Sequence, residues 1–107
     1  MKGVDYTYAH KSEFIKSMKE DLALLQDEVD RLSGKIERSS GAGKAEAERQ
    51  LVAVRAQWKT AKSELEQAED AQEADWDRMQ SGFRKSHGEL KRSIETMRQW
   101  LADKIEP

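Results

Sequence analysis

The sequence predicts an all-α protein, an antiparallel coiled-coil helical hairpin with a long second helix extending past the hairpin. Three observations predict this class. Apolar residues recur at alternating spacings of three and four, one small-residue segment interrupts the pattern, and proline occurs only at Pro107. A narrow apolar stripe at this spacing is typical of helices that pair along a seam. With 107 residues, 37% of them charged, we expect a single helical domain over 1–107.

The first helix is expected over about residues 8–39. Its seam keeps alternating spacings of three and four through three heptads: Ile15, Met18, Leu22, Leu25, Val29, Leu32 and Ile36. The segment Ser39–Gly43 then holds two serines and two glycines, which break helices. We therefore expect a turn at 40–43, with Gly41 in the left-handed conformation that often ends a helix.

A second seam begins after this turn and consists of Ala47, Leu51, Val54, Trp58, Ala61, Leu65 and Ala68. Folding the chain about Gly41–Ala42 places residue i beside residue 83 minus i. This register sets Leu32 beside Leu51 and Leu25 beside Trp58. Large residues mostly face small ones, which favours interdigitation of the two helices.

Beyond Ala68 the apolar pattern shifts, and two interpretations stay open. We favour a second helix over about 44–105, roughly 90 Å long at ~1.5 Å per residue. Its distal apolar face would lack a partner in the chain and would self-associate through Trp76, Met79, Phe83, His87, Leu90, Ile94, Met97, Trp100 and Leu101. The alternative is a three-helix bundle with a second turn near Gly82–Gly88, where Ser86–Glu89 reads as a capping box.

The order of these segments resembles a known group of proteins. The relevant residues are the Lys-rich opening at 11–19, the segment Leu25–Leu32, the segment Glu48–Trp58 and the block Trp76–Phe83. Together they resemble small, largely uncharacterised bacterial coiled-coil proteins that are labelled stress-response proteins. The resemblance covers about residues 11–101 and implies a helical hairpin without catalytic residues. It departs at His87, where the family tends to have a second tryptophan after the glycine.

The residue spacing excludes a phosphate-binding loop and a helical di-metal site. Ser40–Ala45 lacks the first glycine and the hydroxyl residue of a phosphate-binding loop. A helical di-metal site needs Glu-x-x-His pairs, but Thr7 and Arg84 stand three residues before His10 and His87. The chain has no cysteine. We therefore expect no enzyme activity, no catalytic residue, no metal and no cofactor.

The net charge and the distribution of apolar residues indicate which partners and which location to expect. The net charge is -2, so we expect no nucleic-acid binding. The opening Met1–Asp5 lacks the apolar stretch of a signal peptide, and a cytoplasmic location is expected. The expected function is that of a structural or protein-interaction coiled coil, pairing with itself or another coiled-coil protein and serving in a stress response. The alternative is a peripheral membrane- or lipid-surface protein that uses the amphipathic segment 83–105.

Overall fold

A computed structural model describes residues 7–104. It contains a short 3-10 helix, η1 (Tyr8–His10), and three α-helices: α1 (Lys11–Arg38), α2 (Gly43–Asp70) and α3 (Glu73–Lys104). The part of the chain that the structure describes has no strand, so the prediction of an all-α fold is confirmed. The predicted helix end at residue 105 and the opening Met1–Asp5 lie outside the described residues.

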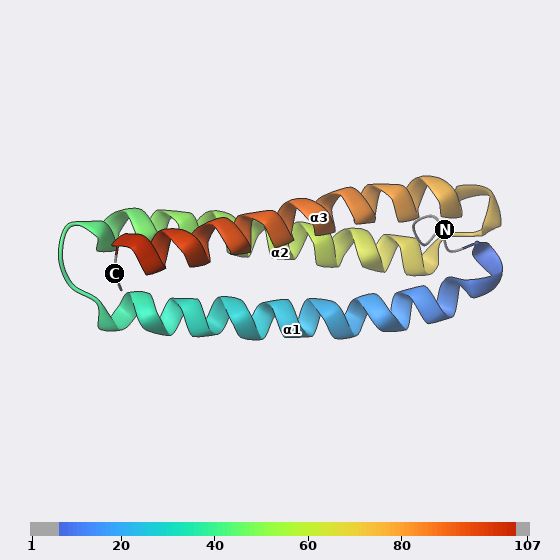
Figure 1. Ribbon diagram of the computed structural model, residues 1–107. Coiled ribbons are helices and arrows are strands. Elements are labelled where there is room, and N and C mark those ends of the chain that lie inside the picture. The colour runs from blue at the N-terminus through green and yellow to red at the C-terminus, as the bar shows by residue number, and fades with distance from the viewer. Residues whose placement is uncertain (1–6, 105–107) are drawn as a thin grey trace.

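The three helices lie along one long axis, and the Cα positions span 52 × 27 × 18 Å. The chain reverses after α1, so that α2 runs back along it, and reverses again into α3 (Figure 1). α3 crosses close to α2 and runs in the same direction as α1. The molecule is therefore a three-helix bundle whose core lies between the helices.

The first turn, at residues 39–42, is stabilised by the serines and glycines that predicted it. Gly41 has a φ of 110°, which confirms its left-handed conformation. The backbone N–H of Ser39 donates to the carbonyl of Ile36 (3.1 Å), and the Ser39 hydroxyl donates to the same oxygen (2.7 Å). These bonds satisfy a carbonyl at the end of α1 that has no partner within the helix.

The second turn corrects the prediction of a long second helix over 44–105. α2 ends at Asp70 and α3 begins at Glu73, and the 52 Å extent excludes a helix of 90 Å. The alternative turn near Gly82–Gly88 is also misplaced, because both glycines lie inside α3. The three-helix arrangement of that alternative is the one observed, with its turn about ten residues earlier.

Local interactions explain why the chain turns at Ala71 without glycine or proline. Ala71 is extended (ψ 142°), and its carbonyl accepts a hydrogen bond from the Lys11 ammonium at 2.6 Å. No basic residue lies in the last turn of α2, so Lys11 supplies from α1 the positive charge that a helix C-terminus favours. Glu73 and Asp75 lie in the first turn of α3, where acidic side chains stabilise a helix start.

The core contains side chains from the two predicted seams and from the distal apolar face of α3, which forms a third seam. The seam residues that are buried are each 9% exposed or less. They are Ile15, Leu22, Leu25, Val29, Leu32 and Ile36 in α1, Ala47, Val54, Ala61, Leu65 and Ala68 in α2, and Trp76, Phe83, Leu90, Ile94, Met97 and Leu101 in α3. Met18, Leu51 and Trp58 are partly buried beside them. The alanines of α2 have small side chains, which suits the close approach of α3 seen in Figure 1.

The contact between α1 and α3 depends on residues outside the predicted seam. Phe14 is buried and packs edge-on against Trp76 (ring centroids 5.7 Å apart) and Phe83 (5.9 Å). Phe14 thus widens the narrow apolar stripe of α1 by one aromatic ring, so that α1 packs against α3 as well as α2. Aromatic pairs of this geometry contribute about 0.5–1.5 kcal/mol beyond their buried area.

Polar side-chain contacts extend the same contact along the bundle. His87 of α3 pairs with Asp21 of α1 and stacks on Phe83 (centroids 5.3 Å apart). Arg98 of α3 binds Glu28 of α1, with Nε to Oε2 at 2.8 Å. The hydrogen bond from Arg98 to Glu28 raises the pKa of Arg98. Basic residues of α3 therefore pair with acidic residues of α1.

Gly82 and Gly88 lower the helix propensity of α3 and offer a test of its continuity. A Cβ added at either position would meet no heavy atom of the described residues within 4 Å, beyond its own neighbouring backbone. Gly82→Ala and Gly88→Ala should each raise the free energy of unfolding by about 0.5–1 kcal/mol, because alanine restricts the unfolded chain. Urea denaturation measures the change. Gly41→Ala is the control and should destabilise, since its φ is positive. Loss of stability in Gly82→Ala would contradict a continuous α3.

Candidate functional site

The residues predicted to mediate self-association are mostly in the core of the monomer. Six are buried to 1% exposure or less: Trp76, Phe83, Leu90, Ile94, Met97 and Leu101. Met79, Trp100 and His87 are partly buried. The prediction of an unpartnered distal face is therefore wrong, because α1 and α2 cover it. Within residues 83–104, the core also covers most of the apolar face that the membrane-surface alternative would use.

A different apolar surface lies between α1 and α2, and no α3 residue lines it. This groove has a volume of about 390 Å³ and is lined by Lys19, Leu22, Ala23, Gln26, Trp58, Lys62, Leu65 and Glu66. A smaller hollow of about 90 Å³ adjoins it, sharing Gln26 and Trp58 and adding Val29, Arg55 and Lys59. We call the two together the Trp58 groove.

The indole of Trp58 is held in place at the centre of this groove. Its Nε1–H donates a hydrogen bond to the carbonyl of Leu22 at 2.9 Å, from α2 to the middle of α1. The ring is partly buried and packs against the core. An indole bound in this way presents a rigid apolar surface at low entropic cost, as anchor residues of protein interfaces do.

Charges of both signs surround the Trp58 groove. Lys19 pairs with Glu69 of α2 at 3.0 Å, Lys62 pairs with Glu66 at 2.8 Å, and Arg55 pairs with Asp30 of α1 at 3.4 Å. The hydrogen bond from Lys62, followed by its positive charge, lowers the pKa of Glu66. The groove thus has an apolar centre and a polar border of mixed charge.

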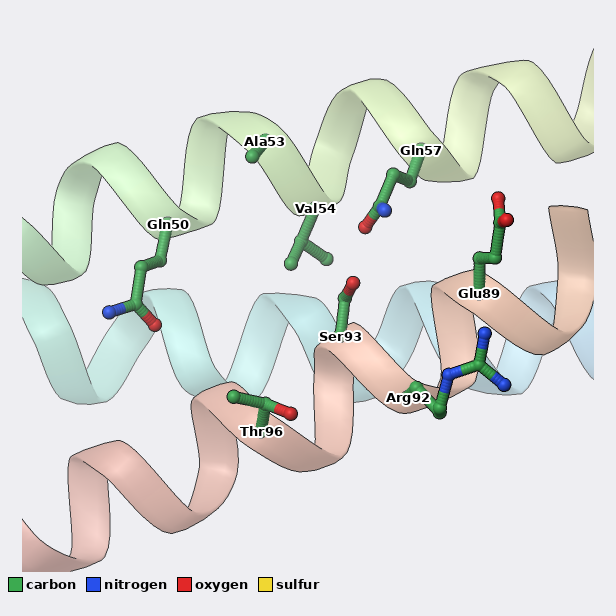
Figure 2. A pocket seen from close by; sticks show the side chains of 8 residues that line it. All are labelled: Gln50, Ala53, Val54, Gln57, Glu89, Arg92, Ser93 and Thr96. Atoms are coloured by element: carbon green, nitrogen blue, oxygen red, sulfur yellow. The ribbon is translucent and has the colours of Figure 1, made fainter.

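A second groove lies between α2 and α3, and most of the residues that line it are polar. It has a volume of about 530 Å³, and eight residues line it: Gln50, Ala53, Val54, Gln57, Glu89, Arg92, Ser93 and Thr96. We call it the α2–α3 groove. In Figure 2 the side chains of Gln57 from α2 and Ser93 from α3 extend toward the space between the helices. It shares no residue with the Trp58 groove.

One atom of the α2–α3 groove is energetically unusual. Gln57 Oε1 is buried and has no hydrogen-bond partner among the described residues. A buried acceptor without a partner costs about 1–3 kcal/mol, and most such atoms in folded proteins have one. Gln57 as a whole is only partly buried, so a ligand that brings an N–H or O–H donor would satisfy this oxygen once the side chain turns toward the open part of the groove.

The apolar periodicity of the sequence did not predict the α2–α3 groove, because most residues that line it lie beside the seam. A signal was present: Gln50, Gln57 and Glu64 are spaced by seven residues, so they form a polar line along one face of α2. Glu64 Oε1 is likewise buried without a partner among residues 7–104. Polar residues that repeat beside a seam can thus indicate a groove at a second helix contact.

Within residues 7–104, no group of three or more histidine and acidic side chains is placed to hold a metal ion, and no helix is long and apolar enough to cross a membrane. No family model, no curated protein and no solved structure matches the chain. The candidate sites are therefore the two grooves.

Proposed function

We propose that this protein is a non-catalytic structural and interaction module that self-associates through the Trp58 groove. In this proposal α1 and α2 form an antiparallel coiled-coil pair, and α3 braces that pair from one side. The observation that carries the proposal is the anchored Trp58 indole in an apolar groove that α3 leaves open. A second copy of the chain is the occupant, with the two grooves facing each other.

The composition of the groove favours a second copy. A twofold dimer brings the same patch of both copies together, so the patch must complement itself. Lys19 and Lys62 lie on the same border as Glu66 and Glu69, so each cation of one copy can reach an anion of the other. A patch of one sign would repel itself instead.

The size of the α1–α2 face is also adequate. Each helix has 28 residues and is therefore about 42 Å long at ~1.5 Å per residue. Two helices about 10 Å wide give a face of roughly 800 Å², which is close to the ~800 Å² that each partner contributes to a stable interface. Apolar side chains at the centre and charged ones outside match the usual anatomy of such interfaces.

Mass measurements over a range of concentrations test this proposal. Sedimentation equilibrium from micromolar to millimolar protein should show a monomer–dimer equilibrium. Ala23→Arg places a charge in the groove at an exposed position and should weaken dimerisation about tenfold or more, equivalent to ~1.4 kcal/mol. Trp58→Ala should weaken it as well, but this change also removes the hydrogen bond to Leu22.

The matched control is Ala53→Arg, the same exchange at an exposed position of the α2–α3 groove. It should leave dimerisation unchanged, and the circular dichroism of both arginine variants should equal that of the parent chain. A parent chain that stays monomeric at every concentration would refute self-association. Equal dimerisation of the Ala23→Arg variant would place the interface elsewhere.

A further inference from the structure

The α2–α3 groove offers a second binding function that is independent of self-association. Polar and charged residues supply six of its eight lining positions, and none of the eight belongs to the Trp58 groove. Its volume of about 530 Å³ falls within the ~300–1,000 Å³ of pockets that bind small molecules. The nature of the ligand follows from the groups that converge there.

Hydrogen-bond acceptors and an anion form one part of the lining. Gln57 Oε1 is buried and unpaired within residues 7–104. The Glu89 carboxylate and the Ser93 hydroxyl come from α3 and face the same groove (Figure 2). A primary ammonium has three N–H donors and no acceptor. With the Gln57 side chain turned toward the open part of the groove, the ammonium satisfies the amide oxygen while Glu89 balances its charge.

A cation lies beside these acceptors. Arg92 is exposed on α3, three residues after Glu89, and also lines the groove. A guanidinium binds a carboxylate through two parallel N–H···O bonds, which makes it selective for planar anions. Because groups of both signs line one groove, a ligand with one positive and one negative group is matched better than a simple anion or cation.

The remaining surface is apolar. Val54 forms the buried part of the lining and Ala53 lies beside it. Together with the Thr96 methyl group, these side chains can contact an aliphatic group of a ligand. We infer that the α2–α3 groove binds a small zwitterion of the amino-acid type, with its ammonium at Gln57 and Glu89, its carboxylate at Arg92 and an aliphatic side chain against Val54.

Titration of the full chain with three matched probes tests this inference. L-leucine carries both charged groups, L-leucinamide lacks the carboxylate, and 4-methylpentanoate lacks the ammonium. Backbone amide shifts in ¹H–¹⁵N spectra should report L-leucine binding at residues 50–57 and 89–96. Each analogue should bind about tenfold more weakly or worse, since each loses one charge-assisted contact.

Two variants assign the contacts. Arg92→Gln should weaken L-leucine binding about tenfold and leave L-leucinamide binding unchanged, because only the carboxylate contact is lost. Gln57→Met removes the amide oxygen at similar size and should weaken both. Ala23→Arg, which disrupts the other groove, should bind L-leucine like the parent chain and so separates this inference from the proposed dimer.

Three outcomes would overturn the inference. The first is the absence of amide shifts at millimolar L-leucine. The second is that 4-methylpentanoate binds as tightly as L-leucine, and the third is that the shifts map outside the α2–α3 groove. A fourth, retention of full L-leucine affinity by Arg92→Gln, would show that the guanidinium does not hold the carboxylate.

Discussion

Phe83→Ala is expected to lower the free energy of unfolding by about 3–5 kcal/mol, the range for removing a buried aromatic side chain. Phe83 is 0% exposed, packs edge-on against Phe14 of α1 and stacks on His87. The variant therefore loses contacts within α3 and between α1 and α3. A domain of ordinary stability has only about 5–15 kcal/mol, so a large part of its stability depends on this ring. Urea denaturation followed by circular dichroism measures the loss.

The same experiment distinguishes a monomeric bundle from a long helix that is buried only by a second copy. In the bundle, the loss should be the same at every protein concentration, because Phe83 packs within one chain. A loss that shrinks on dilution would mean that the ring is buried in an intermolecular contact, because dilution removes that contact from the parent chain as well. Phe83→Leu keeps most of the volume and loses the ring contacts with Phe14 and His87, so it should cost less than Phe83→Ala.

Leu25→Ala should lower the free energy of unfolding by about 2–5 kcal/mol, while Leu24→Ala should change it by no more than about 0.5 kcal/mol. The two leucines are neighbours in one helix, yet Leu25 is 9% exposed and Leu24 is 65% exposed. The intrinsic helix propensity of the exchange is the same at both positions. The difference between the two variants therefore measures burial in the seam alone.

Thermal or urea unfolding of the two variants, side by side, gives that difference. If the two losses were equal, Leu25 would not face the core and the placement of α1 would be wrong. If Leu24→Ala were the more damaging change, the helix would be rotated about its axis, and Asp21 could no longer pair with His87 as it does in the bundle.

The candidate grooves could be predicted only in part from the sequence. The spacing of Trp58 marked it as a seam residue, but its exposed groove exists because α3 covers the other side of the α1–α2 pair. Gln57 and Glu89 are 32 positions apart in the sequence and share a groove only because the chain turns at Ala71. The local sequence pattern around either residue does not predict that the two line the same groove.

The sequence by itself determined the helical class, the three apolar seams and the glycine turn after Arg38. These features follow from spacing and backbone conformation, which are local properties of the chain. Only the tertiary structure decided where the second turn lies and what covers the last helix. The turn at Ala71 has no glycine or proline, and it is stabilised by Lys11 from sixty residues away and by helix-end charges. The burial of α3 likewise depends on Phe14, Asp21 and Glu28 of α1, side chains that lie outside the seam. Such contacts are distant in sequence, so a pattern read along the chain could not place them.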